Sequence, residues 1–357
     1  MRVLHVITSL QTGGAERLMV DLLPRMVKKA NTTVELLVFN GERTPFMDEL
    51  ESKGITVHKL AIGGSVYNPT NIIKMIRHLG LYDIIHTHNT APQVYVPISC
   101  LFLPHHGRLV TTEHGIESKR RSLWWFKPID KWIYKQYAAI VCIADQSRFI
   151  FEQYIGKKRS ISIIYNGIDI TRFSRPINNV AGKDSFIISM VAAFRKEKDH
   201  ATVLRAMTHL PGNYKLILVG DGVGKTAMHS LASELGLGDR VSFLGLRQDV
   251  PDILEQSDVV VLSSHWEAFG LAAVEAMAAG RPVIASDVGG LRNVVGGAGV
   301  LFPHGDDRSL AHDILRLCEN PDEYRKVACR CQEKARQYDI SVTVDRYLAL
   351  YNQLLNK

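Results

Sequence analysis

Residues 258–286, DVVVLSSHWEAFGLAAVEAMAAGRPVIAS, predict a strand, a loop, a helix and a second strand in that order. The apolar run at 259–262 is continuous rather than alternating, as in a parallel strand covered on both faces. A helix is expected from about Leu271 to Ala279, because Gly280 is a typical helix C-cap and Pro282 begins the next apolar run. The stretch therefore predicts a β-α-β unit of a parallel sheet.

Short apolar runs alternate with helix-period segments in both halves of the chain. The strands expected in the first half are Arg2–Thr8, Thr33–Phe39, Ile55–Leu60, Asp83–His86, Arg108–Thr112, Ala139–Ile143 and Ser162–Tyr165. Those expected in the second half are Phe186–Ala192, Lys215–Val219, Val241–Leu244, Val259–Leu262 and Pro282–Ser286. Two such blocks in 357 residues predict an α/β protein with two Rossmann-like, doubly wound domains that face a central cleft.

The domain boundary is expected in the polar stretch 174–184, which separates the two blocks of strands. A first domain is predicted over 1–175 and a second over 183–338. The remaining residues, 339–357, have a helical pattern and are expected to pack back across the hinge onto the first domain.

The composition, with 46% hydrophobic and 22% charged residues, is that of a globular protein with a sizeable core. The net charge of +7 favours anionic partners without choosing among them. The five cysteines include no CxxC pair, as expected of thiols in a reducing compartment. The sequence has no apolar run of about 18 to 20 residues and no signal-peptide pattern at its start. A cytoplasmic protein is therefore expected.

Two glycines, Gly13 and Gly14, follow the first expected strand in the sequence TGGAE at 12–16 and open a helix. Glycine lets the backbone approach a ligand, and a helix N-terminus offers unpaired N–H groups to an anion. The pattern fits a phosphate-binding turn. A tight strand-to-helix turn without a ligand has the same sequence, so the alternative stays open.

Glu267 and Glu275 flank the start of the helix predicted after the 259–262 strand. One carboxylate can accept two hydroxyl hydrogen bonds from a ribose while the other faces a sugar. The amides of Gly270 and Leu271 can meet a diphosphate at the helix N-terminus. A solvated pair favoured by the helix dipole is the alternative, and Phe269-Gly270-Leu271 between the glutamates favours the binding interpretation.

The run Arg195-Lys196-Glu197-Lys198-Asp199-His200 follows the first strand of the second block. Cations at the carboxyl end of a strand can neutralise a diphosphate leaving group. A solvated charged face is the competing interpretation.

His86, His88 and His114 are expected just after two strands of the first block. His114 stands beside Gly115 and can hydrogen-bond a transferred sugar, whereas His86 is expected to be structural. A metal site is not predicted, because two of the three histidines lie two residues apart and no carboxylate spacing completes a site.

The segment GDGVGKT at 220–226 resembles a phosphate-binding loop but matches neither nucleotide-loop pattern. The Walker motif requires a glycine where this chain has Val219, and the third glycine of GxGxxG comes one residue early. ATPase and dehydrogenase functions are therefore not predicted. Gly220 is expected at a strand-end turn that lines the cleft.

Residues 119–135 combine lysines and arginines with three of the four tryptophans, Trp124, Trp125 and Trp132. A basic and aromatic amphipathic segment suits an anionic membrane surface. Nucleic acid can use the same mixture, but no nucleic-acid module accompanies it, so no nucleic-acid partner is expected. Ordinary packing of the aromatic side chains remains an alternative.

Taken together, these residues resemble the retaining glycosyltransferases of family four, which have the two-domain GT-B fold. The most specific part is Glu267-Ala-Phe-Gly-Leu-(three residues)-Glu275, the E-x7-E element of that family. The supporting motifs are Gly13-Gly14-Ala15-Glu16, Thr112-Glu113-His114-Gly115, Asn166-Gly167-Ile168-Asp169, Val219-Gly220-Asp221-Gly222, Phe243-Leu244-Gly245 and Gly289-Gly290-Leu291. The likeness covers nearly the full chain.

The resemblance implies roles for individual residues. The implied donor-binding residues are Gly13, Gly14, Gly220, Gly245, Leu246, Phe269, Gly270, Leu271 and Glu275. The implied catalytic residues are His114, Arg195, Lys198 and Glu267. Within these sets, Glu275 would bind the ribose, Lys198 the phosphates and His114 the transferred sugar.

The resemblance also implies an acceptor-binding first domain, a nucleotide-sugar-binding second domain, and catalysis without a metal or other cofactor. Two positions depart from the family pattern. Ala193 stands where an arginine is usual, so Arg195 is expected to replace it, and Asn293 stands where a glutamate is usual.

The expected function is retaining transfer of a hexose or N-acetylhexosamine from a UDP-sugar to a lipid-diphosphate-linked glycan. Such an enzyme would act in surface polysaccharide synthesis, of O-antigen or capsule, as a peripheral protein on the inner face of the cell membrane. The alternatives are a GDP-mannose-dependent transferase, a nucleotide-sugar 2-epimerase of the same fold, and an inactive binding partner.

Overall fold

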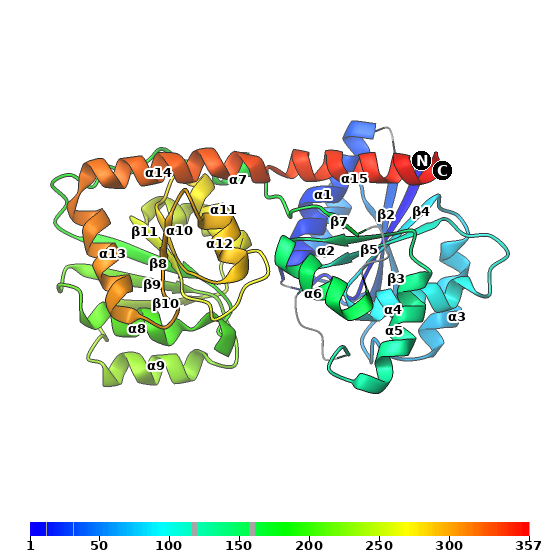
Figure 1. Cartoon of the computed structure of the whole chain (residues 1–357), viewed down its shortest axis with the longest axis horizontal. Helices are drawn as coiled ribbons and strands as arrows, with labels where there is room; N and C mark the ends of the chain where they lie inside the picture. Colours follow the sequence, from blue (N-terminus) through cyan, green and yellow to red (C-terminus); the bar gives the residue numbers. More distant parts are fainter. Residues whose placement is uncertain (12, 31, 116–119, 157–160, 357) are drawn as a thin grey trace. The chain divides into compact units, whose positions relative to one another are not determined.

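The computed structural model describes residues 1–11, 13–30, 32–115, 120–156 and 161–356, so Thr12 and Lys119 of the sequence motifs lie outside the described residues. The chain forms two compact units. Unit 1 comprises Met1–Gly167 and Ile340–Lys357, and unit 2 comprises Ile168–Asp339. In each unit, helices cover both faces of a sheet (Figure 1).

Unit 1 contains a seven-stranded parallel sheet with the order β3-β2-β1-β4-β5-β6-β7. The strands are β1 (Arg2–Ile7), β2 (Thr33–Asn40), β3 (Thr56–Ala61), β4 (Ile84–His88), β5 (Arg108–Glu113), β6 (Ala139–Cys142) and β7 (Ile161–Ile163). The order reverses between β1 and β4. In sheets of this kind ligands bind at the carboxyl ends of the strands, at this switch point.

The helices of unit 1 form two layers. They are α1 (Gly14–Ala30), α2 (Pro45–Ser52), α3 (Thr70–Leu79), α4 (Thr90–Cys100), the 3₁₀ turn η1 (Trp124–Phe126), α5 (Lys127–Lys135), α6 (Asp145–Ile155) and α15 (Ile340–Leu355). Buried residues of α1, α2 and α15 share one core cluster with the sheet. Those of α3 to α6 share a second cluster with the other face.

Unit 2 contains a six-stranded parallel sheet with the order β10-β9-β8-β11-β12-β13. The strands are β8 (Phe186–Val191), β9 (Tyr214–Val219), β10 (Val241–Gly245), β11 (Val259–Leu262), β12 (Val283–Ser286) and β13 (Val300–Phe302). The order reverses between β8 and β11, so the switch point of this sheet lies between those two strands.

The helices of unit 2 connect these strands and cover the sheet. They are α7 (Ile170–Phe173), η2 (Lys196–Lys198), α8 (His200–Thr208), α9 (Lys225–Glu234), α10 (Val250–Gln256), α11 (Leu271–Ala278), α12 (Gly289–Val295), α13 (Asp307–Glu319), α14 (Pro321–Ala335) and η3 (Arg336–Tyr338). Helix α11 packs against α7, α12 and α14, and α8 packs against α9 and α13.

The predicted strands are present with small shifts at their ends. One edge strand, β13, is additional, because its three residues are too few to stand out as an apolar run. The strand predicted over Asp83–His86 extends to His88, so the prediction that the segment His86-Thr87-His88 follows the strand is wrong. Both histidines lie within β4 and are fully buried.

The two compact units divide between Gly167 and Ile168, before the polar segment 174–184 in which the boundary was predicted. The polar segment after Ile168 is anchored to unit 2 by side chains from later in the chain. The buried Arg281 donates to the carbonyl of Pro176 at 2.7 Å. The buried Asp258 pairs with Lys183 at 2.6 Å.

Replacement of Asp258 by alanine should destabilise unit 2 selectively. The carboxylate is fully buried and accepts hydrogen bonds from Lys183 Nζ at 2.6 Å and from the Ile187 backbone N–H at 2.9 Å. We expect a loss of about 2–3 kcal/mol, less than for a fully buried pair because Lys183 is partly exposed. Hydrogen exchange of peptides from β8 and β11 would measure it separately from unit 1.

The matched control is Asp252→Ala, which removes an exposed carboxylate 3.3 Å from Arg175 in the same unit. It should change the stability by less than about 1 kcal/mol. Equal effects of the two substitutions would contradict the anchoring role of Asp258.

Candidate functional site

In unit 2, a lysine and a glutamate meet at the switch point of the sheet. Lys198 ends η2, in the segment between β8 and α8, and Glu267 lies in the loop after β11. The ammonium of Lys198 forms an ion pair with Glu267, and both side chains are largely but not fully buried. The sequence therefore placed these two residues correctly at strand ends, and the neighbouring positions of β8 and β11 bring them into contact.

Hydrogen bonds lock the two strand ends together. The hydroxyl of Ser263 lies 2.8 Å from the carbonyl oxygen of Asp199 and 3.1 Å from that of Lys198. The backbone N–H of His265 donates to the carbonyl of Glu197 at 2.8 Å. Asp199 has a φ of 49° and caps α8 by accepting from the Thr202 N–H at 3.3 Å. These contacts hold the turn that carries Lys198 beside the loop that carries Glu267.

The loop that carries Glu267 turns sharply into α11 at Gly270. Its φ of +95° lies in the left-handed region, and a Cβ atom there would lie 2.7 Å from Leu291 Cδ2. The positive φ favours glycine at this position, whereas the leucine methyl group could shift to make room for a Cβ atom. Helix α11 begins at Leu271, and the amides of Ala273 and Val274 already donate to the Gly270 carbonyl. The amides before them have no preceding helical turn that could supply an acceptor.

The two remaining motif residues of this segment have different environments. Glu275 lies one turn into α11 and is partly buried. Phe269 is buried and packs edge-on against Tyr338, with ring centroids 5.4 Å apart. Phe269 therefore anchors the loop in the core of unit 2.

The glycine turn after β9 is a packing feature as well as a candidate binding element. Gly220 has a φ of +138°, and a Cβ there would lie 2.1 Å from the carbonyl oxygen of Ala192. Its N–H donates to the carbonyl of Gly245 at 2.9 Å. Leu246, directly after β10, is exposed at this same end of the sheet.

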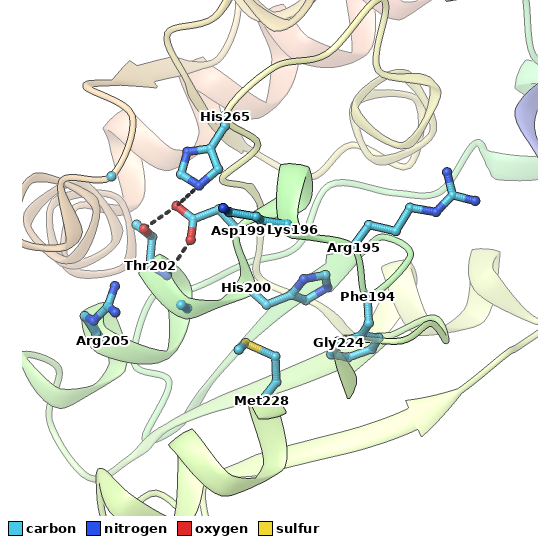
Figure 2. Close-up of a pocket in the computed structure, with 12 residues that line it drawn as sticks. Phe194, Arg195, Lys196, Asp199, His200, Thr202, Arg205, Gly224, Met228 and His265 are labelled. Atoms are coloured by element: carbon cyan, nitrogen blue, oxygen red, sulfur yellow. Dashed lines mark hydrogen bonds and ion pairs between the residues drawn. The ribbon is translucent and has the colours of Figure 1, made fainter. Parts of the chain in front are cut away.

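Arg195 is not placed like Lys198. Its side chain is 68% exposed, and its guanidinium is 4.0 Å from Glu197. It belongs to the lining of a cavity of about 390 Å³ that does not include Lys198 or Glu267. Figure 2 shows the guanidinium of Arg195 directed away from Asp199 and His265.

The sequence motifs did not predict this cavity, which lies beside α8. Its lining residues are Phe194, Arg195, Lys196, Asp199, His200, Ala201, Thr202, Arg205, Gly224, Met228, His265 and Gly305. The ring of His200 stacks on Phe194 at 4.2 Å, and burial lowers the pKa of His200 to about 4. The wall is thus an aromatic stack with cationic side chains around it (Figure 2).

In unit 1, His114 directly follows β5 and lines a cavity of about 300 Å³. The other lining residues are Asn89, Thr90, Gln93, Thr112, Glu113, Gly115 and Arg121. Burial lowers the pKa of His114 to about 4, so the ring is neutral at pH 7. Its Nδ1 atom is buried and has no hydrogen-bond partner among the described residues.

Glu113 is a structural part of this cavity rather than a free carboxylate. It pairs with Arg121 and accepts hydrogen bonds from Tyr134 at 2.6 Å and from Gln93 at 2.9 Å. The neutral His114 is therefore the group on this strand end with a nitrogen available to a ligand.

Gly13 and Gly14 lie at the start of α1, at the same end of the sheet. A Cβ at Gly13 would lie 2.2 Å from a carboxylate oxygen of Glu16. That carboxylate in turn lies 3.4 Å from the side-chain nitrogen of Asn89. Glu16 and Asn89, which the sequence motifs did not assign, thus connect the glycine turn to the His114 cavity.

One cluster in the described part of the chain has metal-ligand spacing. One nitrogen each of His5, His86 and His88 lies within 4.8 Å of the others, and all three rings are buried. All of their ring nitrogens already have hydrogen-bond partners. A cation here would also be a buried charge without a carboxylate, which is costly.

Two family models match adjacent parts of the chain. Residues 12–172 match "Glycosyltransferase Family 4", and residues 172–338 match "Glycosyl transferases group 1". The chain is a family 4 glycosyltransferase. This glycosyltransferase is 28% identical over 305 residues to UDP-Gal:alpha-D-GlcNAc-diphosphoundecaprenol alpha-1,3-galactosyltransferase of Escherichia coli, covering 77% of each chain.

A second relative is N-acetyl-alpha-D-glucosaminyl L-malate synthase of Bacillus anthracis, 27% identical over 286 residues, covering 76% of this glycosyltransferase and 75% of the relative. Among solved structures, that of Anabaena HepE in complex with UDP and glucose has a TM-score of 0.86 at 23% identity, covering 99% of each chain. This likeness confirms the predicted two-domain Rossmann-like, GT-B fold of the glycosyltransferase.

Acidification should destabilise unit 1 of the glycosyltransferase. Burial lowers the pKa of His5 to about 3 and that of His114 to about 4, while the pKa values of His86 and His88 fall well below the usual value. The unfolded chain binds more protons than the folded one below about pH 6.5, so stability is lost as the pH falls from 6.5 towards 4. Urea unfolding at pH 7 and pH 5, followed by tryptophan fluorescence, should show a loss of at least about 2 kcal/mol.

His88→Gln should flatten this pH dependence, whereas the control His106→Gln, at an exposed position of the same unit, should leave it unchanged. Equal unfolding free energies of the native chain at the two pH values would contradict the buried neutral histidines.

Proposed function

We propose that this glycosyltransferase moves a hexose or N-acetylhexosamine from a UDP-sugar to a glycan acceptor with retention of anomeric configuration. The observation that carries the proposal is the Lys198–Glu267 pair held beside the start of α11, with Glu275 one turn further on. The relative in Escherichia coli is named for UDP-galactose, and HepE was solved with UDP and glucose. Both favour a UDP-sugar donor.

The donor would bind along the carboxyl ends of β8 and β11. The ribose hydroxyls would donate to Glu275, and the diphosphate would meet Lys198 and the first amides of α11 at Gly270 and Leu271. Glu267 pairs with Lys198. An incoming diphosphate would compete for that ammonium, which leaves Glu267 able to accept hydrogen bonds from sugar hydroxyls.

The remaining predicted residues fit supporting roles. Gly13 and Gly14 would let the donor phosphate approach the backbone at the start of α1. Gly220, Gly245 and the exposed Leu246 would border the nucleotide at the ends of β9 and β10. Phe269 would act through the position of its loop, because its side chain is buried.

The chemistry needs charge stabilisation of the leaving diphosphate more than a protein nucleophile. Lys198 and the helix amides would stabilise the developing negative charge as the glycosidic bond breaks. The leaving phosphate oxygen would take the proton of the attacking acceptor hydroxyl on the same face of the sugar. Arg195, exposed beside this turn, would add positive charge in place of an arginine at Ala193.

We further propose that no metal or other cofactor is required. In many nucleotide-sugar enzymes a divalent cation neutralises the diphosphate. Here Lys198, Arg195 and the N-terminus of α11 would supply the positive potential for that task.

The acceptor is proposed to be a lipid-diphosphate-linked glycan reached at an anionic membrane surface, as in surface polysaccharide synthesis. Trp124 is 85% exposed and Trp125 52% exposed, so neither forms part of the core. Lys127, Lys131 and Lys135 of α5 follow in the chain. Exposed indoles beside lysines suit the interface of an anionic bilayer. No helix in the described part of the chain has the length and apolar character needed to cross a bilayer.

The donor and the site are tested together with a panel of nucleotide-sugars in EDTA, with and without bacterial lipid extract. UDP should be released from one UDP-sugar, and lipid should increase the rate. Glu275→Gln should weaken binding of that donor roughly 10- to 100-fold, because hydrogen bonds to a charged group are lost. Isothermal titration with UDP would measure the change.

The matched control is Glu234→Gln, at an exposed position on α9 of the same unit, which should leave UDP affinity unchanged. Release of GDP from GDP-mannose would replace the UDP assignment. Complete conversion to another nucleotide-sugar without acceptor would identify a 2-epimerase, and activity lost in EDTA but restored by a divalent cation would overturn metal independence.

The membrane proposal predicts that Trp124→Ser combined with Trp125→Ser weakens binding to phosphatidylglycerol-containing vesicles about tenfold or more, because two exposed indoles no longer enter the interface. Vesicle sedimentation would measure the binding. The control is Val223→Ser, which removes a fully exposed apolar side chain from unit 2. Equal vesicle binding by the two variants, or vesicle binding that does not depend on salt concentration, would contradict the proposed membrane-binding surface.

A further inference from the structure

A chain of hydrogen bonds runs through the core of unit 1 and ends at the cavity beside β5. Its members come from β1, β4, the end of β5 and the C-terminal helix α15. In order they are Tyr347, Thr112, His86, Tyr351, His5, His88 and His114. All of them except His114 are buried. The chain follows the switch point between β1 and β4 rather than any single sequence motif.

The first half of the chain links α15 to β5 and β4. The hydroxyl of Tyr347 lies 3.0 Å from the hydroxyl of Thr112. The Thr112 hydroxyl lies 2.7 Å from Nε2 of His86. Nδ1 of His86 lies 2.5 Å from the hydroxyl of Tyr351, on the next turn of α15.

The second half leads from α15 back to the strand ends. The hydroxyl of Tyr351 lies 3.5 Å from Nε2 of His5, which is the longest link. Nδ1 of His5 lies 3.0 Å from Nε2 of His88. Nδ1 of His88 lies 2.8 Å from Nε2 of His114, whose other nitrogen remains for the cavity.

Each imidazole in the chain carries one proton at neutral pH. Burial lowers the pKa of His5 to about 3 and of His114 to about 4, and it lowers those of His86 and His88 well below the usual value. A neutral imidazole has one donor and one acceptor nitrogen. Each ring must therefore accept on one side and donate on the other, so the chain has a direction.

Tyr347 sets that direction. Its hydroxyl is fully buried, and Thr112 is its hydrogen-bond partner among the described residues. A buried donor without an acceptor is costly, more so than an acceptor with a spare lone pair. The Tyr347 hydroxyl therefore donates to Thr112, whose own proton is then directed to Nε2 of His86.

The remaining protons follow from this first step. His86 accepts at Nε2, so it carries its proton on Nδ1 and donates to the hydroxyl of Tyr351. Tyr351 then has Nε2 of His5 as its acceptor. The same reasoning places the proton of His5 on Nδ1.

The last two rings continue the pattern. His5 donates to Nε2 of His88, and Nδ1 of His88 donates to Nε2 of His114. The proton of His114 is then on Nδ1. In the opposite direction every ring would carry its proton on Nε2, and the Tyr347 proton, in the core, would have no acceptor among the described residues. In the first direction the unshared proton is that of His114, which lines a cavity of about 300 Å³ where water or a ligand can accept it.

We propose that this buried chain fixes His114 as the neutral tautomer with the proton on Nδ1, so that it presents an N–H donor to a hydroxyl oxygen of the transferred sugar. The identity of that oxygen rests on the proposed sugar transfer, whereas the tautomer does not. Tyr347, Tyr351 and the three buried histidines are positioning residues that act through His114. His114 itself serves as a hydrogen-bond donor and not as a base.

The fixed tautomer of His114 would influence which sugars the cavity accepts. A fixed N–H donor stabilises a sugar that offers an oxygen at this point and leaves its own proton unpaired against a deoxy sugar. A histidine free to change tautomer would accept or donate equally well. The C-terminal helix α15 thus contributes to substrate selection without touching the cavity.

The direct test is nitrogen NMR of the ligand-free protein with ¹⁵N-labelled histidine at pH 7. We expect His5, His86, His88 and His114 to show a protonated Nδ1 and an unprotonated Nε2, with the signals of His114 assigned from a His114→Gln sample. Because no substrate is present, this result is independent of the proposed function. An Nε2-protonated His114 would overturn the proposal.

Two variants then test the direction of the chain. Tyr347→Phe removes the group that sets it, so His114 should show a second, Nε2-protonated population. Tyr351→Phe breaks the link between α15 and His5 and should lower kcat/KM for the donor about 3- to 10-fold. The tautomer signal separates this effect from a general structural one.

The control is Tyr137→Phe, which removes a buried hydroxyl of the same unit that bonds Thr87 and the Gln93 carbonyl outside the chain. It should cost similar stability in urea unfolding but leave the His114 tautomer unchanged. If Tyr347→Phe and Tyr137→Phe gave the same single tautomer as the native protein, Tyr347 would not set the direction.

Discussion

The candidate donor site depends on one pairing, that of β8 with β11 at the centre of the unit 2 sheet. Each strand by itself is followed by a loop that forms no site alone. Their parallel pairing places Lys198 against Glu267, and the Ser263 hydroxyl then clamps the two loops through the carbonyls of Lys198 and Asp199. The charge pair and the start of α11 exist as one site only because the strand order reverses here.

A different constraint governs unit 1, where polar groups are buried at the corresponding switch point. Three imidazoles and two phenols in a core are tolerated only if every donor finds an acceptor. The register of β1 with β4 places His5 opposite His86, and α15 supplies Tyr347 and Tyr351 from the other end of the chain. A network satisfied in this way is rigid, because reversing one hydrogen bond requires reversing all of them.

The two arrangements suit the two demands of glycosyl transfer. In the proposed reaction, a leaving diphosphate needs positive charge held in place before it forms, which Lys198 and the α11 amides would offer. The transferred sugar would need to be oriented by fixed dipoles, which His114 held in one tautomer would supply. Family 4 membership and the GT-B fold agree with both arrangements. The individual side chains determine which atoms could contact the substrate.

The sequence alone determined the fold class, because continuous apolar strands and helix-period segments alternate in both halves. It also determined the E-x7-E element, the placement of Lys198 in the segment that follows β8, and the placement of His114 directly after β5. It could not determine the boundary at Gly167, since the polar segment that follows is anchored by Asp258 and Arg281 from far along the chain. Nor could it show that Arg195 is exposed while Lys198 is paired. The local sequence pattern indicates which residues belong to the same helix or strand. The burial of side chains, the pairing of charges and the positions of protons depend instead on contacts between residues far apart in the sequence, such as His86 and Tyr351.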